Sequence, residues 1–259
     1  NRRGAHGICF DYIVDPDGTG DFTTVQGAVD AWELTSNNAS IYICPGTYAE
    51  DVTIGTGGAL TTSLRMYGVA AGEVTIGSVN GLTFIHRSSH RSGWRFENIT
   101  WDGTAAGSSV RGTTVINHGA YFFNCLFTRK VSADWAGTQF TDCIFQKGYH
   151  VEATQSPANT RFLRCTFSDT NTWANAPSWH TFTECIFGAS TDIIVATAGV
   201  ADVSFVNCDF DTSGGAKNFF TNTVTGIANL RFMGCHFGRP GTVACIYLQS
   251  GGGSGLVVD

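Results

Sequence analysis

Charged residues are scarce in this sequence. Only 14% of its 259 residues are Asp, Glu, Lys or Arg, whereas soluble domains average about 25%. Proline is rare too, with 5 residues, and the apolar runs fall far short of the ~18 residues that a membrane-spanning helix needs. These shortages exclude a disordered chain, which needs high charge, and a proline-rich linker. We also expect no insertion into a membrane.

A broad basic face is missing as well. The net charge is −6, which argues against a nucleic-acid partner. The sequence begins at Asn1 without Met, so we expect that an upstream segment has been removed or precedes it, together with any targeting signal. The sequence does have 42% apolar residues, which is enough for one continuous core, and we predict a single domain over residues 1–259.

One six-residue pattern recurs from the middle of the sequence onward: Phe, two variable residues, Cys, one variable residue, Phe. A degenerate copy at residues 96–101 precedes six full copies. Cys and the last Phe are two residues apart and share one face of a strand. The first Phe is three residues before Cys, so the chain must bend between them. The cysteines of the six copies are Cys125, Cys143, Cys165, Cys185, Cys208 and Cys235.

A unit of about 20 residues that turns corners and stacks on its own copy is a rung of a β-solenoid. We therefore predict an all-β parallel β-helix with three strands per rung and about ten rungs. A short N-terminal helix should cap it. Residues 23–26 have the spacing of a capping box, and Val25, Ala28, Val29 and Trp32 follow at helical spacing. Residues 1–35 would form the N-terminal loop and capping helix, and residues 36–259 the rungs. Further strands are predicted at residues 115–118, 149–152, 193–196, 219–222 and 245–248.

The six repeat cysteines are predicted to form a ladder inside the solenoid. Parallel stacking places equivalent Cβ atoms about 4.8 Å apart, beyond the span of about 3.5–4.5 Å in a disulfide. We therefore expect reduced, buried thiols that act as small apolar fillers. The spacing also lacks the CxxC-type pattern of a metal site, so no metal and no cofactor are expected. A reduced core favours folding in a reducing cytoplasm.

Two stretches near the N-terminus resemble a known group of proteins. Residues 17–29 read Asp-Gly-Thr-Gly-Asp-Phe-Thr-Thr-Val-Gln-Gly-Ala-Val, and residues 43–50 read Ile-Cys-Pro-Gly-Thr-Tyr-Ala-Glu. They resemble the start of pectin methylesterases and related proteins of the pectin-lyase-like superfamily, and this resemblance implies a right-handed parallel β-helix. Pectin methylesterases carry Asp-Phe-Ile-Phe-Gly and Gly-Arg-Pro-Trp segments with a catalytic Asp and Arg. This sequence offers Glu-Cys-Ile-Phe-Gly at 184–188 and Gly-Arg-Pro-Gly at 238–241, so no catalytic residue is carried over.

The segment 149–152 places His150 and Glu152 on one face of a predicted strand. Such a pair could act as general acid and base on a glycoside or uronate. The alternative is a solvated outer face. A basic run at residues 86–91, with Arg95 nearby, could hold an acidic sugar or a phosphate, although a solvated loop is the preferred interpretation.

Three tryptophans, Trp135, Trp173 and Trp179, fall in predicted loops. Exposed aromatic rings stack on sugars or become buried at a subunit interface. Local packing against the rod is the alternative. Residues 172–180, which hold two of the three, are the best candidate for either role, sugar binding or a subunit interface.

Three functions remain open from the sequence. The preferred interpretation is a non-catalytic protein of a virion or cell surface, such as a phage decoration, appendage or tailspike-like protein, that forms a homotrimer or joins other virion or surface subunits. It rests on the reduced core, the sparse charge, the missing catalytic motifs and a C-terminal end that a partner subunit or further chain would cover. The alternative is a polysaccharide-active enzyme (a lyase, glycoside hydrolase or carbohydrate esterase) on acidic glycans, with His150 and Glu152 as its site. The third is a carbohydrate-binding module that uses the loop tryptophans.

Overall fold

The structure is a computed structural model of the chain. It describes residues 2–3, 9–35, 37–55, 62–70, 72–79, 81–84, 93–103, 108–112, 119–132, 137–151, 158–175, 177–188, 192–211, 218–223, 226–238, 246–248 and 253–259.

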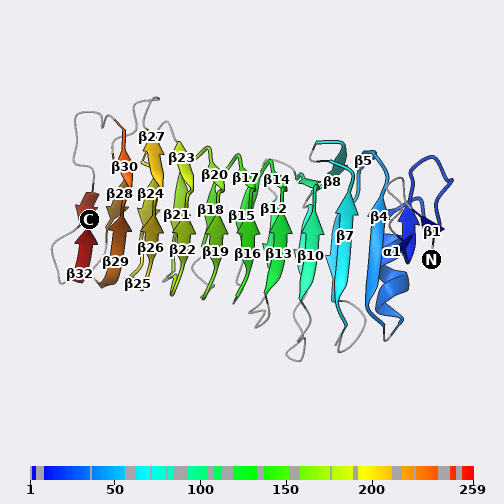
Figure 1. Cartoon of the computed structure of the whole chain (residues 1–259), viewed down its shortest axis with the longest axis horizontal. Coiled ribbons are helices and arrows are strands. Elements are labelled where there is room, and N and C mark those ends of the chain that lie inside the picture. Colours follow the sequence, from blue (N-terminus) through cyan, green and yellow to red (C-terminus); the bar gives the residue numbers. More distant parts are fainter. Residues whose placement is uncertain are drawn as a thin grey trace.

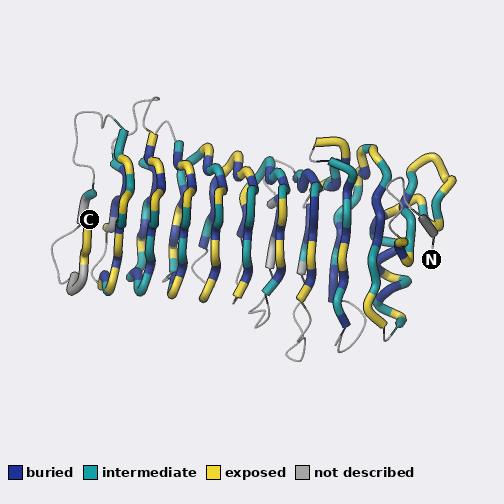
Figure 2. Tube along the Cα trace, viewed as in Figure 1, coloured by how far each residue is buried: buried dark blue, intermediate teal, exposed yellow. Residues whose placement is uncertain are grey.

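Short strands stack side by side along a rod, with the N-terminus at one end and the C-terminus at the other (Figure 1). Among the described residues, neighbouring coils pair in parallel, and the antiparallel pair is β1 (Arg2–Arg3) with β2 (Cys9–Phe10) near the N-terminus. The prediction of an all-β parallel β-solenoid is therefore confirmed. Buried residues follow one another along the rod (Figure 2), and the buried apolar side chains form one core cluster.

The first face is a sheet of 12 described strands, called here the long sheet. It begins at β3, which lies within residues 1–35 and pairs in parallel with β4. Its strands are β3 (Tyr12–Val14), β4 (Ala39–Ile43), β7 (Leu64–Gly68), β10 (Trp94–Glu97), β13 (Ala120–Phe123), β16 (Gln139–Thr141), β19 (Arg161–Leu163), β22 (Thr181–Thr183), β25 (Val200–Ala201), β26 (Ser204–Val206), β29 (Ile227–Met233) and β32 (Gly253–Val258).

The second face is a sheet of 9 described strands. These are β5 (Gly46–Tyr48), β8 (Val74–Ile76), β11 (Thr100–Trp101), β14 (Leu126–Phe127), β17 (Ile144–Phe145), β20 (Thr166–Phe167), β23 (Ile186–Gly188), β27 (Asp209–Asp211) and β30 (His236–Phe237).

The third face consists of two sheets that follow one another along the rod, and a bridge between Val151 and Trp173 joins them. The first holds β6 (Val52–Ile54), β9 (Leu82–Phe84), β12 (Ser108–Gly112), β15 (Lys130–Ser132) and β18 (Tyr149–His150). The second holds β21 (Asn171–Trp173), β24 (Ile194–Ala196), β28 (Phe220–Asn222) and β31 (Ile246–Leu248).

The bend that the repeat requires lies at the residue before each cysteine. Six of these residues take the left-handed backbone conformation that L-residues rarely adopt, with φ between 49° and 59°. The chain therefore passes from the long sheet to the second sheet within two residues, and Phe and Cys both face inward although their spacing is odd. The six residues are Asn124, Asp142, Arg164, Glu184, Asn207 and Gly234.

The cysteines and phenylalanines of the repeat line the core as two kinds of ladder. Five of the six cysteines are buried and Cys235 is partly buried, and all six are free thiols. Each thiol donates to the carbonyl of the repeat Phe one coil earlier, as Cys165 Sγ does to Phe140 O at 3.5 Å. Rings of successive coils stack, with 4.5 Å between the centroids of Phe162 and Phe182. Stacked rings at this distance add attraction to the burial of apolar area.

One α-helix, α1 (Val25–Glu33), covers the N-terminal end of the core. Val25, Ala28, Val29 and Trp32 are fully buried on its inner side, as the helical spacing predicts. The cap differs from the predicted box. Thr24 is the N-cap residue, and the Glu50 carboxylate accepts hydrogen bonds from the main-chain N atoms of Val25 and Gln26 at 2.7 and 3.0 Å. A carboxylate from the first coil thus satisfies donors that the helix itself leaves open.

A buried polar pair interrupts the apolar core. His180 Nδ1 lies 3.0 Å from Ser178 O, and because a carbonyl oxygen only accepts, Nδ1 carries the proton. Nε2 then accepts from the Tyr149 hydroxyl at 3.4 Å. Burial lowers the pKa of His180 to about 4, since the charged imidazolium would lose its hydration. The pair is therefore neutral at pH 7.

Candidate functional site

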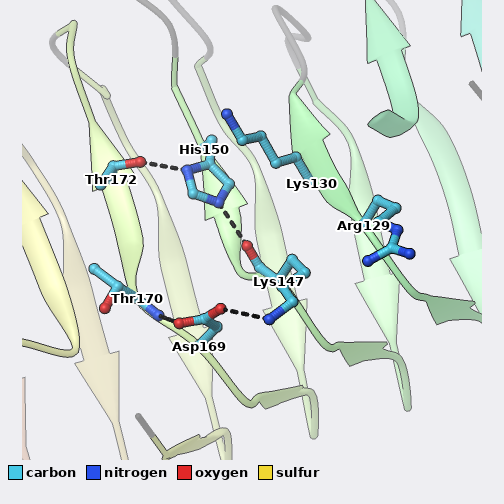
Figure 3. A pocket seen from close by; sticks show the side chains of 7 residues that line it. All are labelled: Arg129, Lys130, Lys147, His150, Asp169, Thr170 and Thr172. Carbon is cyan, nitrogen blue, oxygen red and sulfur yellow. Dashed lines mark hydrogen bonds and ion pairs between the residues drawn. The ribbon is translucent and has the colours of Figure 1, made fainter. Parts of the chain in front are cut away.

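A groove of about 330 Å³ lies on the third face, where β15, β18 and β21 come from three consecutive coils. Each coil supplies its strand and the turn just before the strand. The lining side chains, shown in Figure 3, are Arg129, Lys130, Lys147, His150, Asp169, Thr170 and Thr172.

The groove holds three cationic side chains and one carboxylate. Lys147 Nζ lies 3.2 Å from Asp169 Oδ2, and both side chains reach solvent. The second oxygen of Asp169 accepts from the main-chain N of Thr170 at 2.8 Å, which fixes the carboxylate in the groove. Arg129 is anchored by its Nε, which donates to Gly103 O at 3.1 Å. In a protein of net charge −6, this local excess of positive charge attracts anionic ligands.

Gly148 allows the turn before β18 to come close to the next coil. Its φ is +74°, and a Cβ atom added there would lie 2.5 Å from Thr170 O. Any other residue would push the two coils apart at the groove. Asn171 holds the same contact from the other side, since its Oδ1 accepts from the main-chain N of Tyr149 at 2.8 Å. Both interactions fix Lys147 and His150 opposite Asp169 and Thr172.

His150 is held at both ring nitrogens. Nε2 lies 2.6 Å from Lys147 O, so this nitrogen carries a proton. Nδ1 is hydrogen-bonded to the Thr172 hydroxyl. In the neutral ring Nδ1 therefore accepts from Thr172, and it can take up a proton only after that bond is rearranged. The two hydrogen bonds give His150 a structural role, because they link Lys147 and Thr172 in the wall of the groove. Its predicted partner, Glu152, lies outside the described residues, so the acid–base pair stays a prediction.

A second carboxylate lies one coil further on. The Thr170 hydroxyl donates to the main-chain O of Asp192 at 2.6 Å. The Asp192 carboxylate accepts from Asn218 N and Nδ2 at 3.1 and 3.2 Å and from Thr221 Oγ1 at 3.0 Å. Asp169 and Asp192 therefore lie on neighbouring coils on either side of Thr170. The Asp192 carboxylate is thus bound to the following coil, and Asp192 supports the groove by holding Thr170 in place.

The structure corrects one of the three candidate tryptophans. Trp173 is 1% exposed in β21, where it points inward while Thr172 points out, so its expected place in an exposed loop is wrong. The residues of β21 alternate between buried and exposed, as expected for a strand, and the Trp173 ring lies in the core beside Phe182. Trp179 is 56% exposed at a corner with φ of 55° and stays a candidate for stacking on a sugar. Trp135 lies outside the described residues.

Sequence analysis missed most of the groove. The signal for it was present in the repeat, because Arg129, Lys147 and Asp169 each stand two residues after the final Phe of a copy. Equivalent positions in a solenoid stack on one another, so charges at this position gather on one face. The repeat of Phe and Cys alone did not indicate these charges, because they lie outside its six residues.

The part of the chain that the structure describes holds no group of three or more His, Cys, Asp or Glu residues arranged to bind a metal ion. In the same part, no helix has the length and apolarity that crossing a membrane requires.

Comparison with known proteins shows the fold. No protein-family model matches the chain, and no curated protein matches it in sequence. Two crystal structures of the Aspergillus niger pectin methylesterase, in different deglycosylated forms, are similar over 96% of this chain and 93% of theirs, with 17% identity and TM-scores of 0.65 and 0.63. The pectin methylesterase from carrot has 11% identity over 89% of this chain and 83% of its own, with a TM-score of 0.43.

The chain therefore has the right-handed parallel β-helix fold of pectin-lyase-like proteins, as the N-terminal resemblance implied. The expectation of a non-catalytic virion or surface protein is wrong. Two solved structures that share this fold over 96% of the chain, at 17% identity, are those of a pectin methylesterase, and this finding replaces that expectation. Short sequence motifs did not indicate this, because a groove in this fold is formed by residues from consecutive coils. The oligomeric state and the location of the protein stay predictions.

Proposed function

We propose that the chain is a polysaccharide-active enzyme on acidic glycans and that it hydrolyses an ester of such a glycan at the groove of the third face. One observation carries this proposal: Lys147 pairs with the Asp169 carboxylate of the next coil, and Arg129 and Lys130 line the same groove. Uronic-acid chains repeat a carboxylate at every sugar, and a row of cations one coil apart suits such a ligand. Arg and Lys bind carboxylates through charge-assisted hydrogen bonds.

The chemistry follows from the arrangement around Asp169. Its carboxylate takes a proton from water while the water oxygen attacks the acyl carbon of the ester. The negative charge that develops on the carbonyl oxygen is stabilised by the neighbouring cations. The bond to the alcohol then breaks, and the alcohol leaves with the proton from Asp169. Asp192, fixed by three hydrogen bonds, keeps Thr170 and the adjoining coil in place and is the second carboxylate to test.

Ester hydrolysis is favoured over lyase and glycoside hydrolase chemistry by the likeness in fold to pectin methylesterases. The three reactions leave different products. The test is to incubate the purified chain with methyl-esterified polygalacturonate, unesterified polygalacturonate and alginate, and to measure methanol, unsaturated ends and reducing ends. Methanol from the esterified polymer alone supports an esterase. Unsaturated or reducing ends without methanol would replace the esterase proposal by a lyase or a hydrolase.

The finer description of the fold is also a proposal. Three strands per rung and about ten rungs agree with a division of the coils among three faces and a spacing of about 4.8 Å between coils, with β25 and β26 together forming the long-sheet segment of one coil. A crystal structure of the full chain tests it, because every coil could then be counted, and a coil without a strand on one of the three faces would contradict it.

A further inference from the structure

The outer surface of the long sheet carries a row of side chains that begins on β7 and ends on β29. Strand pairing places one residue of each strand at the same register position, so that Arg65 pairs with Arg95 and Arg95 with Tyr121. The row continues through Gln139, Arg161, Thr181 and Ser204 to Arg231. We call these residues the outer row. It lies on a different sheet from the groove described above.

Charge along the outer row is of one sign. It contains four arginines and no Asp or Glu, in a protein whose net charge is −6. Arg95, Arg161 and Arg231 recur at every third strand, which corresponds to about 14 Å along the rod. Gln139, Thr181 and Ser204 stand between them and offer amide and hydroxyl groups. Positive charges at regular intervals with neutral hydrogen-bonding groups between them suit an acidic chain that also carries hydroxyls.

At the N-terminal end of the outer row, one buried carboxylate holds two arginine side chains in place. Glu97 is 6% exposed, and its Oε1 accepts from Arg65 Nε at 2.7 Å and from Arg95 Nε at 2.8 Å. The shared carboxylate holds both guanidinium groups side by side and leaves their terminal amino groups for another acceptor. Arg65 and Arg95 border a groove of about 370 Å³, which Asp11 and Ser40 also line. The Asp11 carboxylate and the Ser40 hydroxyl, which can hydrogen-bond to sugar hydroxyls, therefore lie beside the two arginines.

Aromatic rings accompany these charges on the same surface. Tyr121, in the outer row, is 47% exposed, and Phe123 beside it is 38% exposed. The Arg65 guanidinium lies over the ring of Tyr67, 5.8 Å from its centroid. Exposed rings of this kind stack on the apolar faces of sugars. A single-stranded nucleic acid would also use cations and rings, but the uncharged amide and hydroxyl groups between the arginines favour a sugar chain.

We propose that the outer row is a second binding surface that holds an acidic polysaccharide lengthwise along the rod. It does not depend on which reaction occurs in the groove of the third face. It would keep a long polymer attached to the protein while the groove acts on another part of the chain. Attachment at two places raises the local concentration of substrate at the groove.

The test uses two arginines that are three residues apart in one coil. Arg161 lies in the outer row, whereas Arg164 lies at the corner and is paired with Asp142. Fluorescence anisotropy would measure the affinity of labelled polygalacturonate for the Asp169→Asn chain, which serves as the common background because it should leave the polymer intact. Three variants are made in this Asp169→Asn background. They are Arg161→Gln, the double change Arg161→Gln/Arg231→Gln, and the control Arg164→Gln. Dextran and oligo-dT are the comparison ligands.

We expect the double variant to bind polygalacturonate about tenfold more weakly and the control to stay within about twofold. Dextran should bind none of the variants measurably. In the otherwise unchanged protein, Arg161→Gln/Arg231→Gln should leave turnover of a small soluble ester as it is, which separates this proposal from the function of the groove. Unchanged affinity in the double variant, an equal loss in the control, or tighter binding of oligo-dT than of polygalacturonate would overturn it.

Discussion

Lys147 and Asp169 form an ion pair between consecutive coils, with 3.2 Å between Nζ and Oδ2. Each stands two residues after the final Phe of its repeat copy, so the stacking of the repeat brings them together. The pair is part of the groove that also holds Arg129, Lys130 and His150. The same regularity that builds the core therefore places opposite charges side by side on the surface.

Lys147→Gln should weaken the binding of an acidic substrate. The change removes one cation from the groove, and exposed ion contacts contribute up to about 1 kcal/mol each, so we expect KM for partially methyl-esterified polygalacturonate, which keeps free carboxylates, to rise about fivefold. For a small neutral ester, KM should change by less than about twofold, since that substrate has no carboxylate to bind. Steady-state kinetics on both substrates checks this, and an equal rise on both would count against a role of Lys147 in binding charge.

Protonation of His180 should destabilise the fold in acid. Burial lowers the pKa of His180 to about 4, from an ordinary value of 6.5. Between these values the unfolded chain binds a proton that the folded chain does not, so stability is complete above pH 6.5 and falls as the pH drops toward 4. A shift of this size corresponds to about 3 kcal/mol.

The Tyr149→Phe/His180→Phe variant removes both members of the buried pair and keeps rings in their places. Its free energy of unfolding would be measured by urea titration at several pH values. Between pH 6.5 and pH 4, we expect it to fall by about 3 kcal/mol less than that of the unchanged protein. A variant that retains the full wild-type slope would show that other groups cause the acid sensitivity.

The left-handed corner at Glu184 should prefer glycine. Its φ is 54°, a conformation that costs about 1 kcal/mol for most L-residues and almost nothing for glycine. Glu184→Gly should raise the melting temperature, and Glu184→Val should lower it, since a β-branched side chain fits this conformation poorly. The Arg161→Gly variant, in the adjacent strand β19, is the control, where glycine should destabilise. Stabilisation by glycine at both positions would argue against strain at the corner.

The cysteine ladder should stabilise the fold through packing. Cys185 is fully buried, whereas Cys235 is only partly buried near the last described coils. Cys185→Ala should lower the free energy of unfolding by about 1–2 kcal/mol, because the cavity remains, and Cys235→Ala should lower it by less. Urea unfolding of both variants measures the difference, and equal effects would mean that burial does not set the contribution of the thiols.

Local spacing predicted the corners and the core of this fold. The odd offset between the first Phe and Cys required a bend, and the structure places that bend at residues such as Asn124 and Glu184. The helix face from Val25 to Trp32 was predicted for the same reason, since four apolar residues at helical spacing leave little choice. Both patterns are short in sequence and therefore visible without knowledge of the fold.

The position two residues after each final Phe indicated the charges of the groove, but the strands that form it could not be predicted in the same way. Its strands β15, β18 and β21 have two or three residues each, which is too short to show alternation. Trp173 looked like part of a loop because Asn and Thr precede it, and only the stacking of coils shows that it points inward. Asp192 approaches Thr170 across 22 residues of sequence. Contacts between coils depend on the lengths of the intervening turns, and no local pattern sets those lengths.

Methanol release from methyl-esterified polygalacturonate tests the central claim most directly. The unchanged chain would be compared with Asp169→Asn and with Asp142→Asn, a carboxylate that also pairs with a cation of a neighbouring coil but lies at the corner after the long sheet. We expect the unchanged chain and Asp142→Asn to release methanol at equal rates, and Asp169→Asn to be slower by at least about a hundredfold. A folded chain that releases no methanol, or an Asp169→Asn variant with an unchanged rate, would contradict the account.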